Sequence, residues 1–211
     1  MAAAQTVNAG IIAIVRALVV ALVVVAVVVV GLVVWAVGVN NQLVRLDQNV
    51  NEKWAQVQNV YQRRADLIPN LVETVKGFAA QERTVLTEVT QARASATGVR
   101  LTPEALSDPQ AVQRFQAAQN QLSGALSRLL VTVERYPELK SNQNFLALQT
   151  QLEGTENRIT VERQRYNEAV REYNTRLRIF PGSLVAGVTG FRPKAFFEAT
   201  PESATPPKVK F

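Results

Sequence analysis

Residues 17–39 read ALVVALVVVAVVVVGLVVWAVGV, an unbroken apolar run of 23 residues. As an α-helix this run would be about 34 Å long, and the hydrocarbon core of a bilayer is about 30 Å thick. Valine favours strands in water, but a lone strand in lipid leaves its backbone polar groups unpaired, so the bilayer imposes a helix. We therefore predict a transmembrane helix over residues 17–39, with Arg16 and Trp35 as anchors at its two interfaces.

A cleaved signal peptide is the alternative interpretation of this run, because Ala36-Val37-Gly38 offers small residues at the spacing of a cleavage site. The apolar region of a signal peptide is normally about 7 to 15 residues long, so the length favours a retained single-pass helix. Orientation is open, because Arg16 on one side is nearly balanced by Arg45 and Lys53, which lie among acidic residues on the other.

The chain contains no cysteine and no histidine. This removes thiolate and imidazole metal ligands, the histidine base of hydrolytic triads and the Glu-x-x-His pairs of di-iron bundles. The net charge is +6, but the basic residues are interleaved with acidic ones, whereas nucleic-acid binding normally needs a one-sided basic stripe. We expect no catalytic residues, no metal, no cofactor and no nucleic-acid partner.

Beyond the apolar run, an apolar stripe continues with an eleven-residue repeat, which keeps one face on a nearly straight helix. Its residues are Leu43, Leu46, Val50, Trp54, Val57, Tyr61, Ala65 and Ile68. Neither Gly nor Pro occurs in the short Asn40–Gln42 segment before it, so we predict one helix that is continuous from the bilayer into the soluble domain.

Pro69 interrupts this stripe, either as a kink in one helix or as a turn between two. Length favours a turn, because the segments 43–67, 70–97 and 104–136 then have matching lengths, as an up-and-down bundle needs. Asp108-Pro109 is typical of an N-cap and first turn, and Tyr136-Pro137 closes that helix.

The last helix is predicted from Glu138 to Phe180, where Pro181-Gly182 stops it. The predicted fold class is all-α: a transmembrane helix continuous with an up-and-down four-helix bundle, followed by an extended C-terminal arm. The predicted units are residues 1–16, a short N-terminal segment; 17–39, the transmembrane helix; 40–180, the antiparallel helical bundle; and 181–211, the arm.

The arm begins with a small apolar stretch, Ser183–Gly190, and then mixes aromatic residues with cations. Its aromatic and basic residues are Phe191, Arg192, Lys194, Phe196 and Phe197. If the helices alternate in direction, the arm starts near the membrane, where these side chains would dock on lipid headgroups. Packing on its own bundle or on a neighbouring subunit is an equal alternative. Residues 200–211 are Pro-rich, and we expect them to be extended.

Two blocks of sequence carry a family resemblance. The first is RRADLIPNLVETVKG at residues 63–77; the second comprises YPELK at 136–140, LEGTENRI at 152–159, RQRYN at 163–167, YN at 173–174 and FRPK at 191–194. In order and spacing these blocks resemble the LemA family of bacterial membrane-anchored helical proteins, over about residues 43–211.

The resemblance implies a four-helix bundle behind one N-terminal transmembrane helix, which supports the turn at Pro69, and a location in the bacterial inner membrane. It brings no catalytic residues with it. Two positions depart from the family pattern: Gln81 stands where many members have histidine, and Lys210 stands where an acidic residue is common.

Both blocks are rich in polar residues within otherwise apolar helices. We predict a neutralised structural network between helices, made of Arg63, Arg64, Asp66, Asn70, Glu153, Glu156, Asn157, Arg158 and Arg163. A carboxylate site for Mg²⁺ or Ca²⁺, or an acid/base pair, is the alternative; it would need Glu153, Glu156 and Glu162 to face Asp66 or Glu73. We interpret Tyr136, Tyr166 and Tyr173, with Asn167 and Asn174, as core residues.

The sequence favours a non-enzymatic, membrane-anchored scaffold or adaptor whose partners are the bilayer, further copies of the chain, and another membrane or envelope protein. Membrane remodelling by a curved assembly is one variant of this hypothesis. The alternative from another class is a carboxylate metal-dependent enzyme or ligand sensor that uses Glu153, Glu156 and Asp66.

Overall fold

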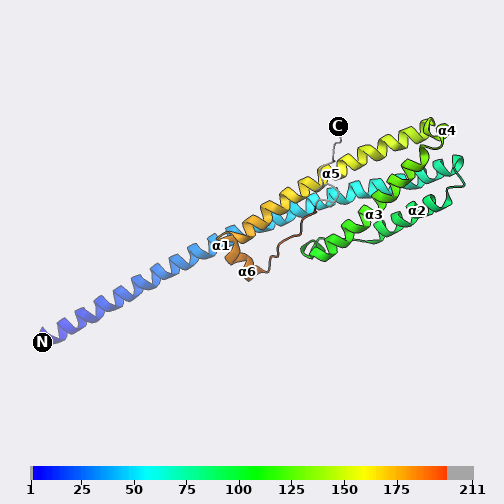
Figure 1. Ribbon diagram of the computed structural model, residues 1–211. Coiled ribbons are helices and arrows are strands. Elements are labelled where there is room, and N and C mark those ends of the chain that lie inside the picture. Colours follow the sequence, from blue (N-terminus) through cyan, green and yellow to red (C-terminus); the bar gives the residue numbers. More distant parts are fainter. Residues whose placement is uncertain (1, 199–211) are drawn as a thin grey trace, which may run out of the picture.

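The computed structural model describes residues 2–198, and every regular element in that range is a helix (Figure 1). The elements are α1 (Ala2–Phe78), α2 (Arg83–Gly98), a 3₁₀ helix η1 (Glu104–Ser107), α3 (Pro109–Val133), α4 (Pro137–Lys140), α5 (Gln143–Arg178) and α6 (Gly182–Thr189). The arm predicted as extended from residue 181 therefore begins with helix α6 instead, because Val185 and Ala186 are packed into the core as one face of a helix. Residues 191–198 follow as an extended segment, and only these residues are called the arm from here on. The all-helical class is confirmed; the predicted conformation of residues 200–211 lies outside the described residues.

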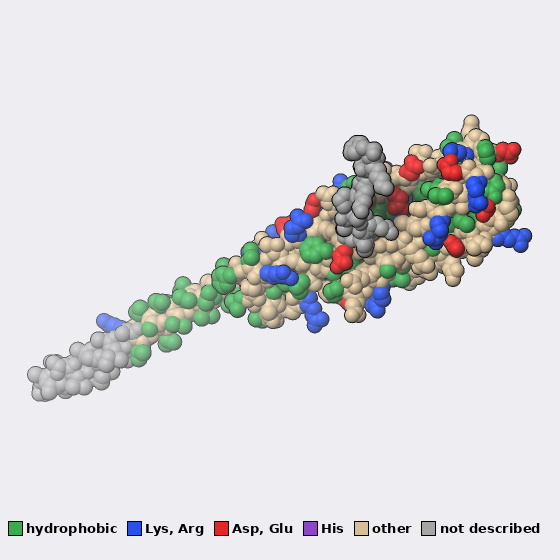
Figure 2. All heavy atoms as spheres, viewed as in Figure 1, with side chains coloured by type: hydrophobic (Ala, Val, Ile, Leu, Met, Phe, Trp, Pro, Cys, Tyr) green, Lys and Arg blue, Asp and Glu red, His purple; other side chains and the backbone are tan. Residues whose placement is uncertain are grey.

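Helix α1 is 77 residues long and passes from the apolar run into the helical domain without a break, so the predicted continuity of the helix is confirmed. Within the described residues it is the one helix that is long and apolar enough to cross a membrane, by length and composition. Among the described residues, no other segment covers the side chains between Leu18 and Val34; Leu22 is 69% exposed and Val27 is 66% exposed. Figure 2 shows this apolar surface on the narrow projection, away from the charged side chains of the bundle.

The predicted turn at Pro69 is wrong, because α1 continues through Pro69 to Phe78. A proline inside a helix has no N–H for the carbonyl four residues earlier, here that of Ala65. In this protein Nε of Arg93, on α2, donates to the Ala65 carbonyl oxygen at 2.7 Å. The missing hydrogen bond is therefore replaced from another helix, and the chain turns only at residues 79–82.

Other helix ends follow the local sequence closely. Asp108 caps α3, its Oδ1 accepting from the backbone N–H of Gln110 at 2.9 Å, as predicted. The helix predicted from Glu138 is instead divided into α4 and α5, because Asn142 caps a new helix through the N–H groups of Asn144 and Phe145.

Two long helices, α1 and α5, lie side by side, while α2 and α3 pair with each other and α2 also packs on α1 (Figure 1). Helix α5 runs opposite to α1: Glu156 contacts Arg64, and further along the chain, just past the end of α5, the ring of Phe180 lies 5.9 Å from that of Trp35. The end of α5 therefore returns to the apolar run.

The core has two apolar clusters. The proximal cluster, nearer the apolar run, surrounds Trp54 and joins α1, η1, the start of α3, the second half of α5, α6 and the arm. The distal cluster joins α1 beyond Ile68 with α2, most of α3, Leu139 and the start of α5. Trp54 is 1% exposed, and its indole N–H donates to the carbonyl of Leu101 at 3.1 Å.

Candidate functional site

A polar layer separates the two apolar clusters. At its centre is Arg64, which is 1% exposed. Its Nη1 donates to Oε1 of Glu156 at 2.8 Å and to Oγ of Ser123 at 2.9 Å, and its Nη2 donates to Oε1 of Gln119. Gln119 in turn donates to the carbonyl of Ala96 at 3.2 Å. Side chains of α1, α3 and α5 and the backbone of α2 thus meet at one level, and we call Arg64, Gln119, Ser123 and Glu156 the polar layer.

The positive charge of Arg64 is compensated by a carboxylate that lies near the protein surface. Glu156 supplies the countercharge from a side chain that is 41% exposed. The guanidinium also lies 5.1 Å from the ring centre of Tyr61, a cation–π distance. Burial raises the pKa of the Tyr61 hydroxyl above its usual value, although Arg163 and Arg64 nearby oppose the rise. The Tyr61 hydroxyl therefore stays protonated near neutral pH.

The structure brings only part of the predicted network together. Arg64 and Glu156 meet, whereas Arg163 turns to the arm: its Nη2 donates to the carbonyl of Glu198 at 2.9 Å, and it lies 4.8 Å from the ring centre of Phe197. The remaining members lie exposed: Arg63, Asp66, Asn70, Glu153, Asn157 and Arg158. Sequence reasoning missed Ser123 and Gln119. The signal for Gln119 was present, because it interrupts the apolar heptads of α3.

The carboxylates considered for a metal or acid/base site point to separate partners. Asp66 accepts from Gln62 at 2.7 Å, Glu153 from Gln149 at 2.9 Å, Glu162 pairs with Arg165 at 2.8 Å, and Glu73 pairs with Lys76 at 3.4 Å. Within the residues that the structure describes, no group of three or more Asp, Glu, His or Cys side chains could hold a metal ion.

A cleft of about 610 Å³ borders the polar layer between α1, α2 and α3. Tyr61, Gln119, Arg93 and Arg100 are among its lining residues, and within residues 2–198 no Asp, Glu or Lys lines it. Nε of Arg93 is already engaged by the Ala65 carbonyl. The lining lacks a carboxylate or amine with which to move a proton.

The arm is held along α5 almost entirely by side chains. Asn174 donates to the carbonyl of Lys194 at 2.8 Å and accepts from its N–H at 2.9 Å. Asn167 makes the same pair of bonds with Phe197, each at 2.9 Å. These two asparagine amides bind the arm backbone as a neighbouring strand would.

Two tyrosines complete the pattern. The hydroxyls of Tyr173 and Tyr166 donate to the carbonyls of Arg192 and Ala195, each at 3.0 Å. Burial raises the pKa of Tyr173 to about 12, with Asp47 adding to the rise, and burial raises the pKa of Tyr166 further still. Both hydroxyls therefore keep the proton that they donate.

The spacing explains why the sequence repeats Tyr-Asn after seven residues. Seven residues of helix rise about 10.5 Å, and three residues of extended chain span roughly 10 Å. The Tyr-Asn pairs at 166–167 and 173–174 therefore meet arm residues that are three apart. Beyond them, Gln116 of α3 holds Glu198, donating to its carbonyl at 2.6 Å and accepting from its N–H at 3.3 Å.

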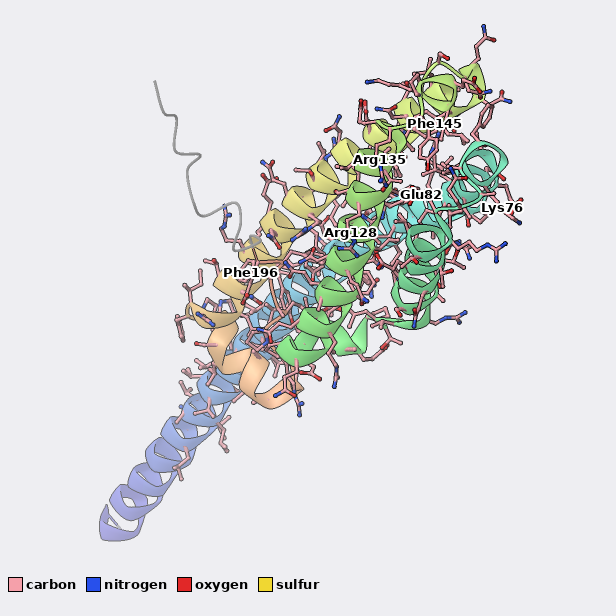
Figure 3. All side chains as sticks on the ribbon, turned by 45° about the vertical axis from the view of Figure 1, so that its right-hand side comes forward. Lys76, Glu82, Arg128, Arg135, Phe145 and Phe196 are labelled. Carbon is pink, nitrogen blue, oxygen red and sulfur yellow. The ribbon has the colours of Figure 1, made fainter. Side chains whose placement is uncertain are left out.

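For the aromatic and basic residues of the arm, the sequence left open a contact with lipid headgroups or packing on the protein's own bundle or on a neighbouring subunit. In the structure most of them pack on the protein's own helices. Phe197 is 5% exposed inside the proximal cluster, Phe191 packs against that cluster, and Nζ of Lys194 pairs with Asp47 at 3.2 Å. Phe196 is 43% exposed and lies on the outside of the bundle in Figure 3, and the side chain of Arg192 is also exposed. Arg16 is exposed on α1.

Gln81 stands where many members of the LemA family, which the sequence resembles, have histidine. It lies at the end of the bundle that is farther from the apolar run. Its Nε2 donates to the Tyr136 hydroxyl at 3.0 Å, and that hydroxyl donates to Glu82 at 2.8 Å. Glu82 also pairs with Arg135 at 3.1 Å (Figure 3). These contacts tie the turn after α1 to the end of α3.

The model of the family described as "LemA family" matches residues 53–211 of this sequence. The chain belongs to the LemA family. The LemA match contains both the polar layer and the Tyr-Asn pairs with the arm that they hold. Two curated proteins of Paramagnetospirillum magneticum are also similar, "Magnetosome protein MamQ 1" and "Magnetosome protein MamQ 2". Each is 27% identical over 182 residues, which covers 79% of this LemA-family chain and 67% of the relative.

Proposed function

We propose that this LemA-family protein is a non-enzymatic scaffold of the bacterial inner membrane: an up-and-down four-helix bundle on a single-pass helix, which self-associates and organises membrane or envelope proteins. One observation carries the proposal. Helix α1 runs without interruption from an apolar run of membrane length into the core of the soluble domain.

The continuity of α1 has a mechanical consequence for such a scaffold. From Val39 to Phe78 the helix extends about 60 Å beyond the apolar run. Val39, Leu43 and Val50, the first buried residues of this stretch, already belong to the proximal cluster, so packing begins at the end of the run. A bundle that assembles with its neighbours would therefore also set the spacing of the membrane helices.

The polar layer supports the bundle arrangement in this proposal. A buried Arg64 needs Gln119, Ser123 and Glu156 at one level; a shift of α5 by a turn would remove its countercharge, and a shift of α3 would remove its other two side-chain partners. We propose that this layer fixes the register of the helices.

The non-enzymatic part of the proposal is supported by the chemistry of the described side chains. Among the described residues, the larger cleft beside the polar layer has no carboxylate or amine in its lining. Glu153 and Glu156 line a second cavity of about 430 Å³, but Asp66 does not, and the three carboxylates each contact a different partner. No observation favours the alternative of a carboxylate metal-dependent enzyme or ligand sensor.

The test is the native mass of the full chain extracted from membranes in polymer-bounded lipid particles, without detergent. The proposal predicts particles that contain several copies, alone or with a second protein in a fixed ratio. A chain that is found as a single copy with no other protein, at its natural abundance, would contradict the scaffold.

A further inference from the structure

The end of α5 places exposed apolar side chains beside the apolar run of α1. Phe180 is 73% exposed, yet its ring lies 5.9 Å from that of Trp35. Ile179 next to it is 50% exposed. Trp35 is four residues, or about 6 Å of helix, inside the end of the run at Val39. Whatever surrounds the last turn of the run must therefore also surround Phe180.

Helix α6 follows directly and has two apolar faces. Val185 and Ala186 are 8% and 6% exposed and pack into the proximal cluster, which attaches α6 to α1 at the level where the run ends (Figure 1). Leu184 and Val188, on the other face, are 60% and 85% exposed. No residue of the segment 182–190 carries a charge.

Cations lie next to this apolar surface on the side away from the run. Arg178 precedes Phe180 and is exposed, and Arg45, also exposed, is six residues beyond Val39 on α1, or about 9 Å of helix. An apolar surface at the level of the acyl chains, with guanidinium groups on its bundle side, matches the profile of a bilayer with anionic headgroups.

We propose that Phe180 and the outer face of α6, with Leu184 and Val188, form a second contact with the membrane, lying in the interface beside the α1 span. The occupant of this surface is lipid, because the surface is continuous with the apolar run. The inference rests on the proposed membrane anchoring of α1. Two contacts on one rigid body fix the rotation and the tilt of the bundle relative to the bilayer, which a single helix leaves free.

The absence of cysteine in the chain permits a direct test with single labelled sites. An environment-sensitive NBD fluorophore is attached to Leu184→Cys or Val188→Cys in the full chain, reconstituted in vesicles of phosphatidylcholine and phosphatidylglycerol. A mixture of brominated phosphatidylcholines, with bromine either near the carbonyl end or near the methyl end of the acyl chains, quenches only labels in contact with lipid and covers both the depth expected for positions 184 and 188 and the middle of the bilayer at position 27. Val27→Cys is the control within the apolar run, and Val131→Cys, at a position that is 71% exposed in the bundle, is the aqueous control.

The inference predicts blue-shifted emission and quenching by brominated lipid at positions 184 and 188, as at 27, and neither effect at 131. Aqueous emission at 184 and 188 with a lipid-quenched label at 27 would overturn the inference and leave the anchoring intact. Blue-shifted emission at 184 and 188 without quenching would also overturn it, because a second copy would then cover the surface. A label at 27 without quenching would contradict the anchoring itself.

Discussion

The hydrogen bond from Arg93 to the Ala65 carbonyl gives a quantitative prediction about why α1 passes through Pro69. Ala65 is 3% exposed, and its carbonyl has no intrahelical donor because Pro69 has no N–H. Hydrogen bonds to charged groups contribute about 1.5–3 kcal/mol. Arg93→Met keeps most of the aliphatic stem and removes the donor, so we expect it to destabilise the protein by about 2 kcal/mol.

The decisive comparison repeats this substitution in a Pro69→Ala background. An alanine at position 69 would supply an N–H to the Ala65 carbonyl, so the loss of the Arg93 guanidinium should then cost much less. The four proteins, as full chains in detergent micelles, are unfolded with urea and followed by circular dichroism. We expect a coupling energy of about 1–2 kcal/mol, within the range of contacting residues. An equal cost of Arg93→Met in both backgrounds would refute the explanation.

Three further predictions concern the arm and the polar layer. Asn174→Ala removes two hydrogen bonds to Lys194, about 1 kcal/mol each, so the Lys194 amide should exchange with deuterium roughly 30-fold faster; unchanged exchange would contradict the arm contacts. Glu156→Gln leaves Arg64 buried without a countercharge and should lower the free energy of unfolding in urea by about 1–3 kcal/mol. This is less than the roughly 3–5 kcal/mol of a fully buried pair, because the Glu156 side chain is 41% exposed. An unchanged free energy of unfolding would argue against this pairing. The pKa of Tyr173 is raised to about 12 in the folded protein, above the value of about 10 in the unfolded chain. The contribution of Tyr173 to stability is therefore complete below pH 10 and is lost as the pH rises towards 12. Tyr173→Phe should reduce this alkaline loss of stability, and an unaltered pH profile would contradict the prediction.

The parts of the fold that sequence predicted correctly depend on local signals. Continuity of α1 followed from the absence of Gly and Pro in residues 40–42, and the start of α3 followed from Asp108-Pro109. The turn at Pro69 was wrong because the donor that repairs the helix comes from Arg93, 28 residues beyond Ala65 in the chain. A local rule about proline has no information about a partner on another helix.

The candidate site was less accessible to sequence reasoning for the same physical reason. The polar composition of the two blocks indicated Arg64 and Glu156, which do meet, but also several residues that the helical twist turns to solvent. The core assignment is confirmed for Tyr166, Tyr173 and Asn174, which are buried, whereas Asn167 is only partly buried, and the role of both asparagines in binding the arm was missed. Their role becomes visible only when the arm is known to be extended, because seven helical residues then match three residues of the arm.

The central claim is that the apolar run and the bundle share one rigid helix. It is tested most directly by a distance measurement across the junction between them. Nitroxide labels at Val27→Cys and Gln56→Cys lie on either side of Asn40, and the protein has no other cysteine to label. With the full chain in vesicles, pulsed electron spin resonance should give one narrow distribution near roughly 44 Å, about 1.5 Å for each intervening residue. A broad distribution, or one centred at a much shorter distance, would show a hinge between membrane and bundle and would contradict the account.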